Sequence, residues 1–354
     1  MSIHPSRTAA LLASLSILSA ALSCRQVVGA SEEARPTAAG PGAFKATTKV
    51  TIVNSAWHLN GKKTHQGNRA EGLLLNVRMV NCTFEDRNPA TCPKDFDPAK
   101  NTEAFVARIP EYVAQGVCGF GLCLQGGACG YDGAVNSAYE PGGSLRPDYM
   151  KRVARVIEAC DKAGAVVMLC CFYQQQDQIL KDEAAVKDAV VNTASWIRDQ
   201  GYTNLCLEIA NEHAHKGFDH VTIREPGGIR ELMGLAKKTC PGLLVSASGM
   251  GGGRLAHEIA IVADFILLHF NSVPVDEILE RVASADKVSK AIVCNEDPRV
   301  GAEGAKALEA SVNAFCSWGF ANLKKNQYYP FKFEGAADDP AVYAKFKELT
   351  SPEK

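Results

Sequence analysis

"NLCLEIANEHAH", residues 204–215, begins as an apolar run typical of a buried strand and ends in polar residues. Asn211 and Glu212 stand side by side where the run stops, and two histidines follow closely. A parallel strand that is covered on both faces is apolar along most of its length. The carboxylate of Glu212 is therefore expected where this strand leaves the core, and its surroundings depend on how the other strands are arranged.

Similar apolar runs alternate with amphipathic stretches along the rest of the chain. The strand-like runs occupy residues 72–81, 117–125, 165–173, 205–211, 243–248, 265–271, 291–296 and, more weakly, 318–323. The helical stretches occupy residues 102–116, 147–164, 183–201, 229–240, 253–263, 275–285, 305–318 and 343–350. This alternation predicts an α/β fold with a parallel sheet covered by helices. Eight such units fit a single-domain (β/α)8 TIM barrel, and an open doubly wound sheet is the alternative.

The segment before the barrel has the features of a secreted protein. Residues 1–24 combine Arg7, an apolar run over 9–22 and small residues before Cys24, which predicts a signal peptide. Two ways of processing this segment remain open, namely cleavage as late as Ala30 or lipidation of Cys24. We expect export to the periplasm, the extracellular space or the outer surface as a lipoprotein.

Two further segments precede the first barrel strand. Residues 25–46 are rich in Ala, Gly, Pro and Glu and are expected to be a flexible spacer, which leaves 47–354 as the barrel domain. Within that domain, residues 49–67 predict two short strands around the turn signal Asn60-Gly61.

Composition excludes several classes of function. The formal net charge is −1, whereas a nucleic-acid binder would carry a basic excess. No segment after residue 24 is long and apolar enough to span a membrane, so membrane contact is expected only through a lipid on Cys24. We expect a monomeric protein.

The chain has 13 cysteines, which in an exported protein predicts disulfides. Cys82 and Cys92 flank a polar loop and are the first pair expected to be bridged. Six others lie in apolar runs, where cysteine acts as a small hydrophobic residue: Cys118, Cys123, Cys170, Cys171, Cys206 and Cys294. No Cys/His spacing fits a zinc site.

The barrel prediction gives Glu212 a partner. A polar residue just past the C-terminal end of a barrel strand faces the active-site mouth. Glu212 ends the fourth strand and Glu296, in "AIVCNED", ends the seventh, so both should lie on one rim. Two carboxylates that face one cavity suit cleavage of a glycosidic bond, because one protonates the leaving oxygen while the other attacks or activates water.

"LEIANE" resembles the E-x-x-N-E motif on the fourth strand of family-five glycoside hydrolases, the cellulase family, and of their retaining barrel relatives. The resemblance implies that Glu212 is the acid/base, that Asn211 binds a sugar hydroxyl and that Glu296 is the nucleophile. His269, in "LLHFN", is similar to the family's His-x-aromatic position beside the nucleophile. Arg78, in "NVRMVN", matches more loosely the arginine that pairs with the nucleophile.

The chain also departs from the family pattern. His213 replaces the proline that usually follows the acid/base, and Phe172 and Tyr173 stand where the third strand often ends in histidine. The strand-eight tryptophan has one candidate, Trp318, which is also the last residue of the helical stretch over 305–318. Besides Asn211, His269 and Arg78, the residues expected to bind substrate are Asn81, Gln125 and Trp318.

Glu208 lies four residues before Glu212 on the same face of the predicted strand. A buried glutamate needs a partner, so we expect it to support Arg78 or a neighbouring residue. Aromatic rings with apolar faces for a sugar, most of which are expected to be ordinary packing residues, are Trp57, Tyr131, Tyr139, Tyr328 and Tyr329.

These observations predict an exported retaining glycoside hydrolase that cleaves O-glycosidic bonds of a poly- or oligosaccharide, with β-linkages expected. Its double displacement requires neither a metal nor an organic cofactor. One alternative is a carbohydrate-binding barrel that has lost turnover. The other is a metal-dependent barrel hydrolase that uses His213, His215 and His220.

Overall fold

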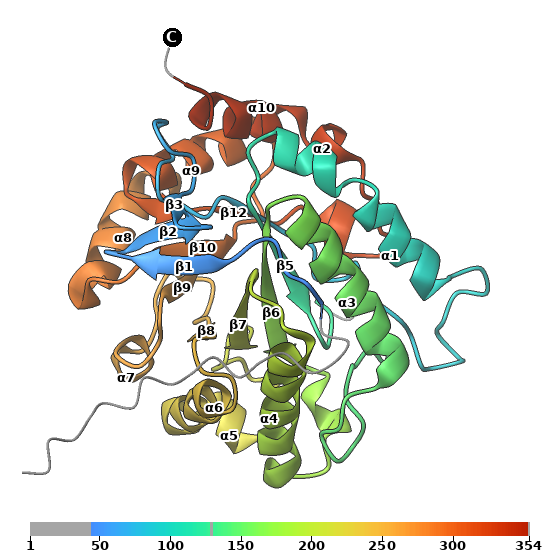
Figure 1. The fold of residues 1–354 in the computed structure, drawn as a ribbon. Coiled ribbons are helices and arrows are strands. Elements are labelled where there is room, and N and C mark those ends of the chain that lie inside the picture. The colour runs from blue at the N-terminus through green and yellow to red at the C-terminus, as the bar shows by residue number, and fades with distance from the viewer. Residues whose placement is uncertain (1–43, 128–129, 353–354) are drawn as a thin grey trace, which may run out of the picture. The chain divides into compact units, whose positions relative to one another are not determined.

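The apolar runs of the sequence form a closed ring of eight parallel strands in the computed structural model, which describes residues 44–127 and 130–352 (Figure 1). The strands are β4 (Asn76–Arg78), β5 (Gly119–Cys123), β6 (Val166–Phe172), β7 (Leu205–Ala210), β8 (Leu244–Ser246), β9 (Ile266–His269), β10 (Ile292–Glu296) and a split eighth strand, β11 (Cys316–Ser317) with β12 (Gly319–Phe320). Neighbours pair in the orders β12-β4-β5-β6-β7-β8 and β11-β10-β9. Bridges Ser248–Leu267 and Asp297–Phe320 join the two sets. The predicted TIM barrel is confirmed, and the open sheet is excluded.

Helices follow the strands and surround the ring. They are α1 (Pro98–Val106), α2 (Ile109–Ala114), α3 (Pro147–Lys162), α4 (Glu183–Gln200), α5 (Val221–Arg224), α6 (Pro226–Thr239), α7 (His257–Ala260), α8 (Ile278–Ala285), α9 (Gly301–Asn313) and α10 (Pro340–Leu349). Shorter helical turns span Asp177–Ile179, Val275–Glu277, Asp286–Val288, Leu323–Gln327 and Gly335–Asp338. Within the described part of the chain, no helix has the length and apolar character needed to cross a bilayer.

Local sequence explains where these helices begin. Side chains of Asp97, Asp182 and Asp339 accept hydrogen bonds from the free backbone N–H groups of the first turns of α1, α4 and α10. The helix predicted over 102–116 is wrong as one unit, because Pro110 lacks an N–H and cannot continue a helix from the preceding turn. The helix predicted over 253–263 is also reduced, to the single turn of α7.

A short antiparallel hairpin precedes the barrel. It consists of β1 (Val50–Val53), β2 (Ala56–Leu59) and β3 (Lys62–Lys63). The predicted turn at Asn60-Gly61 is confirmed, with φ angles of 52° and 79°. A second tight turn at Asn54-Ser55, with φ angles of 50° and 62°, divides the first predicted strand into β1 and β2.

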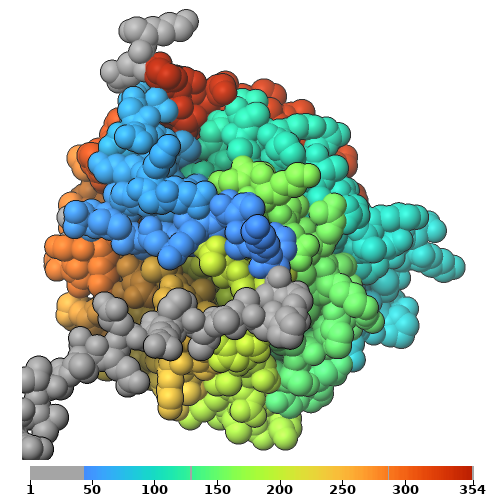
Figure 2. Space-filling model, viewed as in Figure 1, coloured from blue at the N-terminus to red at the C-terminus, as the bar shows by residue number. Residues whose placement is uncertain are grey.

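This hairpin closes the N-terminal end of the barrel. Trp57 of β2 is fully buried, and its ring lies 5.3 Å from that of Phe265 in an edge-on contact. Val50 N–H donates to the carbonyl of Thr203, at the start of β7, at 2.9 Å. Figure 2 shows the hairpin residues lying across this face of the barrel. The strands therefore leave only their C-terminal ends free to build a site.

Two further sequence predictions concern the N-terminal segment and the cysteines. The signal peptide over 1–24, the lipid on Cys24 and the spacer up to residue 43 lie outside the described residues. The predicted Cys82–Cys92 disulfide is wrong, since both thiols are free, as are the other nine cysteines that the structure describes. Cys82 is buried in the core, where it packs as a small hydrophobic residue, while Cys92 lies on the loop and is only half-buried.

Candidate active site

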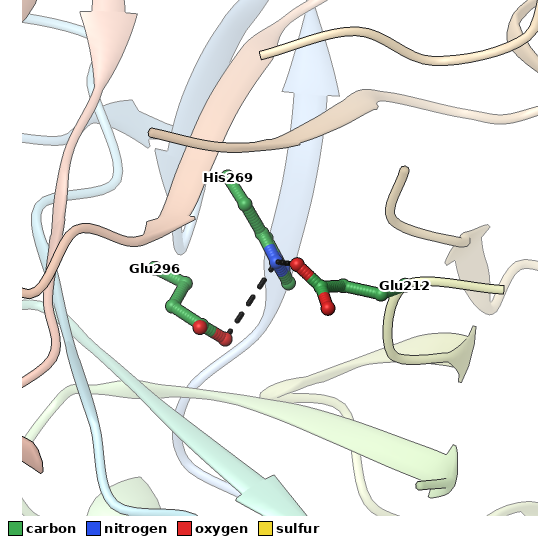
Figure 3. A group of neighbouring side chains, drawn as sticks. All are labelled: Glu212, His269 and Glu296. Atoms are coloured by element: carbon green, nitrogen blue, oxygen red, sulfur yellow. Dashed lines mark hydrogen bonds and ion pairs between the residues drawn. The ribbon is translucent and has the colours of Figure 1, made fainter. Parts of the chain in front are cut away.

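Three side chains converge at the C-terminal ends of three barrel strands. Glu212 follows β7, His269 ends β9 and Glu296 ends β10, and Figure 3 shows all three pointing toward one another. His269 Nδ1 lies 3.2 Å from Glu212 Oε1 and 3.6 Å from Glu296 Oε2. A carboxylate oxygen of Glu212 and one of Glu296 lie within 4.8 Å of each other. The strand ends therefore place the two glutamates on one rim, as the sequence predicted.

The two carboxylates differ in their surroundings. The Glu296 side chain is 7% exposed, and Arg78 Nε of β4 lies 3.0 Å from its Oε2. Asn271 Nδ2 donates to Oε1 of Glu296 at 2.7 Å. Burial alone would raise the pKa of Glu296, but the charges of Arg78 and His269 and the Asn271 hydrogen bond hold this pKa below its usual value. Glu296 is therefore held in its ionised form.

His269 is fully buried between the carboxylates. Burial would lower the pKa of His269, but the negative charge of Glu296 and the hydrogen bond to Glu212 outweigh it and raise this pKa. Its Nε2 atom has no hydrogen-bond partner among the described residues. The His269 imidazole is thus more easily protonated than an isolated histidine, and its Nδ1 lies within hydrogen-bond distance of Glu212.

Asn211 is linked to the same network. Its Oδ1 accepts from Arg78 Nη2 at 2.6 Å, and its Nδ2 donates to Gln174 Oε1 at 3.2 Å. Arg78 therefore contacts both the residue before Glu212 and the carboxylate of Glu296. Because Arg78 is itself buried, it fixes β7 and β10 relative to each other at the site.

The backbone of Glu212 has an unusual conformation. Its φ angle is 48°, in the left-handed region that few non-glycine residues adopt. Ser248, just past β8, accepts the Glu212 N–H on its Oγ at 2.8 Å and donates that hydroxyl to Glu208 Oε1 at 2.6 Å. Glu208 also accepts from Asn295 Nδ2 at 3.2 Å. The expected supporting role of Glu208 is met by Ser248 and Asn295, the latter next to Glu296 in the chain.

Three residues of this site were missed by sequence reasoning, namely Gln174, Ser248 and Asn271. Asn271 carried a usable signal, because it lies two residues after His269 and alternation puts both on one face of the strand. Gln174 and Ser248 carried none, since a polar residue after a strand is common and only the register of the ring gives them their partners.

Three predicted substrate-binding residues do not face the site. The Asn81 amide is used by the backbone of Gly127 and Gln327, and the Gln125 amide by the backbone of Tyr173 and Gln176. Both are fully buried and tie the rim loops together instead of offering free groups to a ligand. These two predictions are corrected accordingly.

Trp318, between β11 and β12, points away from the barrel axis. Its ring packs 5.7 Å from that of Phe346 on α10, and its Nε1 donates to Asp297 Oδ2 at 2.9 Å. The inward position belongs to Gly319, where a Cβ atom would lie 2.3 Å from Asn76 Oδ1. The prediction that Trp318 binds substrate is therefore wrong, because the one-residue alternation of the strand turns it outward.

Of the aromatic candidates, Trp57 and Tyr139 are buried packing residues. Tyr131 and Tyr329 meet on the rim, with ring centroids 5.7 Å apart, in the loops that follow β5 and β12. Tyr328 and Tyr329 are 45% and 38% exposed. These two rings are the most exposed of the predicted aromatic groups.

Two groups of side chains contain residue types that bind metals, namely the three histidines after β7 and the group of Glu212, His269 and Glu296. His213, His215 and His220 turn their Nδ1 atoms to the Arg224 carbonyl, the Gly217 N–H and Asp177, and they form no group of converging ligands within the described ranges. The ligand atoms of Glu212, His269 and Glu296 do converge. Arg78 and the Asn271 N–H already occupy Glu296, and a further cation would be repelled there. The positive groups around Glu296 thus favour catalysis by the two carboxylates over the binding of a metal ion.

No family model and no curated protein matches the chain. Solved structures with the same fold do match, at low identity. A β-1,4-D-mannanase from Cryptopygus antarcticus is 10% identical with a TM-score of 0.57, and the match covers 86% of this chain and 95% of the mannanase. A family 5 glycoside hydrolase from Prevotella bryantii is 9% identical with a TM-score of 0.56, with 82% and 99% of the two chains covered.

A Bacteroides vulgatus protein, provisionally assigned as a glycoside hydrolase, is 11% identical with a TM-score of 0.58. The match covers 85% of this chain but spans only 60% of that protein's length. The likeness concerns the fold, which is the barrel fold of the family-five glycoside hydrolases that the sequence resemblance implied.

Proposed function

We propose that the protein is a retaining glycoside hydrolase in which Glu296 is the nucleophile and Glu212 the acid/base. The observation that carries this proposal is the separation of the two carboxylates, whose oxygens come within 4.8 Å of each other. Retaining enzymes hold the pair about 5–5.5 Å apart, while inverting enzymes need about 6.5–9.5 Å to admit a water molecule between carboxylate and sugar. A single glutamate on the rim would not support this chemistry.

In the first displacement, a Glu296 oxygen attacks the anomeric carbon, and the bond from that carbon to the leaving oxygen breaks. Glu212 gives its proton to the leaving oxygen, so the first product departs as an alcohol. Arg78 and His269 keep Glu296 ionised, and together with Asn271 they hold its carboxylate in place for the attack. The product of this step is a covalent glycosyl-enzyme.

In the second displacement, ionised Glu212 takes a proton from water. The water oxygen then attacks the anomeric carbon and releases Glu296. The Glu212 side chain is 13% exposed and the Glu296 side chain 7%, which fits a base that receives water from solvent and a nucleophile that is shielded from it. Two inversions at one carbon give net retention of configuration.

The substrate is proposed from the chemistry of similar folds. Several of the structures with this fold are mannanases or endoglucanases, and three are described as β-1,4-mannanases. A β-1,4-linked polysaccharide or oligosaccharide is therefore the first substrate class to test. Asn211 precedes Glu212 and donates to Gln174, whose half-buried amide presents polar groups suited to sugar hydroxyls.

The test is chemical labelling followed by rescue. A 2,4-dinitrophenyl 2-deoxy-2-fluoro-β-glycoside should inactivate the protein and leave one sugar on Glu296, which peptide mass spectrometry would locate. Glu212→Ala should still release dinitrophenol from the unfluorinated glycoside, since this leaving group needs little protonation. Added azide should then speed turnover and give a β-glycosyl azide.

The matched control is Glu258→Ala, which removes an exposed carboxylate from the short helix α7 and should leave turnover unchanged. Wild-type turnover by Glu212→Ala on a substrate with a poor leaving group would overturn the acid/base role. A label on any residue other than Glu296 would overturn the nucleophile role. Sugar binding without turnover or labelling would favour the inactive carbohydrate-binding barrel.

A further inference from the structure

A pocket of about 700 Å³ begins directly beside Glu212, outside the two catalytic strand ends. His213, the next residue in the chain, lines it, and so does Gly249, which follows Ser248. Ser248 is the residue that holds the Glu212 backbone N–H. The pocket thus lies next to the acid/base residue along the chain, between the end of β7 and the loop after β8.

The lining of this pocket is basic. Lys216, Arg224 and Arg254 contribute three positive charges, and Glu225 is the only carboxylate among the lining residues. Burial lowers the pKa of His213, so this ring is neutral and neither adds to nor offsets the charge. The net charge of the lining is therefore +2, from three cations and one anion.

These cations have no acidic partners. Of the 13 arginines that the structure describes, ten form an ion pair with a carboxylate, and Arg224, Arg230 and Arg254 do not. Two of these three unpaired arginines line this one pocket, and Lys216 forms no ion pair with any described residue either. Two of the three unpaired arginines are thus gathered in one pocket together with an unpaired lysine.

One of the three is also partly desolvated. Arg224 Nε is buried and has no hydrogen-bond partner among the described residues. A buried N–H donor without an acceptor costs free energy, and an arginine fork is shaped to bind a planar or tetrahedral oxyanion. An anion that entered the pocket would compensate the unpaired charge of this guanidinium.

We propose that this pocket binds an anionic substituent of the substrate, a uronic acid carboxylate or a sulfate ester, on the sugar at the leaving-group side. The inference rests on the proposed glycosidase function, since the acid that protonates the leaving oxygen faces the leaving sugar. A sugar bound next to Glu212 on that side extends toward His213 and Gly249. Its acidic group then meets Arg224, Arg254 and Lys216.

The experiment measures binding separately from turnover. Calorimetry would compare three sets of β-linked oligosaccharides of equal length with the full chain, namely neutral, uronate-bearing and sulfated. We expect at least one anionic set to bind about tenfold tighter than the neutral set, with the preference shrinking as salt increases. The set that shows the preference identifies the anion, and a uronate preference should vanish when the carboxylate is protonated at low pH.

The variant Lys216→Gln with Arg254→Gln removes the two exposed cations and keeps the catalytic residues. It should lose the preference for anionic sugars while its affinity for the neutral set stays unchanged. The matched control is Arg230→Gln, an exposed and unpaired arginine on α6 that lies outside the pocket. This control should keep the preference.

Equal affinity of the wild-type protein for charged and neutral sets would overturn the proposal, as would a preference that the double variant retains. Turnover of a neutral aryl glycoside is measured in parallel. Turnover without any anionic preference means that only the pocket assignment fails. Anionic preference without turnover means that the glycosidase assignment fails.

Discussion

Arg78 Nε lies 3.0 Å from Glu296 Oε2, and both side chains are almost completely buried. Arg78 comes from β4, while Glu296 ends β10, so the barrel must close for the pair to form. A buried charge whose partner is removed is left uncompensated and tends to lose its charge. This pair therefore sets the charge state of the proposed nucleophile.

Replacing Arg78 by Gln is expected to raise the pKa of Glu296, because the opposite charge that lowers it is gone. The acid limb of the kcat/KM profile reports the ionisation of this carboxylate in the free protein. That limb should move to higher pH by about one unit or more, in line with the effect of a close opposite charge. Arg155→Gln, which removes an exposed arginine paired with Glu103, should leave the limb in place. An unmoved limb in Arg78→Gln would contradict the role given to Arg78.

Replacing Ser248 by Ala removes the acceptor of the Glu212 N–H and the donor to Glu208. The Glu212 carboxylate should then be less well placed, which lowers kcat by about tenfold or more and changes KM much less. Ser246→Ala is the matched control on β8, since it removes a buried hydroxyl that donates only to the Phe265 carbonyl. Equal losses of activity in the two variants would show that Ser248 acts only through stability.

Burial raises the pKa of Glu208 despite the nearby charge of Arg78. The folded protein thus holds this proton more tightly than the unfolded chain, so the contribution of Glu208 to stability is present at low pH and is lost as the pH rises. Glu208→Gln cannot titrate and still offers an oxygen to Ser248. The free energy of unfolding of the wild type, minus that of Glu208→Gln, should fall as the pH rises from about 4. Urea unfolding at a series of pH values measures this difference, and a constant difference would refute the linkage.

Trp57 closes the end of the barrel away from the site. Trp57→Ala should lower the free energy of unfolding by about 3–5 kcal/mol, as expected for a fully buried ring. Trp196→Ala removes a half-buried ring on α4 and should cost less. KM of the folded Trp57→Ala protein should match the wild type. A cost below that of Trp196→Ala would mean that the hairpin is not part of the barrel core.

The sequence predicted what depends on repeating patterns. Alternating runs predict eight strand–helix units, and the C-terminal ends of parallel strands share one rim. Glu212 and Glu296 could therefore be placed together across 84 residues of chain, and the structure has them within 4.8 Å. Glu208 could be assigned to the interior because it shares the face of Glu212.

The remaining features depend on one-residue details. Trp318 and Gly319 differ by one position, yet one packs on α10 and the other faces the barrel interior, and no periodicity extends over so short a strand. Asn81 and Gln125 lie at strand ends as expected, but loops that are distant in sequence take up their hydrogen bonds. The expected Cys82–Cys92 bridge failed for a similar reason, since Cys82 turns into the core.

The left-handed backbone of Glu212 costs stability at the residue that supplies the proposed acid/base. Glycine adopts a φ of 48° without strain, whereas a residue with a side chain costs about 1–2 kcal/mol there. Glu212→Gly would therefore relieve strain in the folded protein while it removes the proposed acid/base. A selection for thermostability alone would therefore favour Glu212→Gly. The glutamate would be retained only if activity were selected as well.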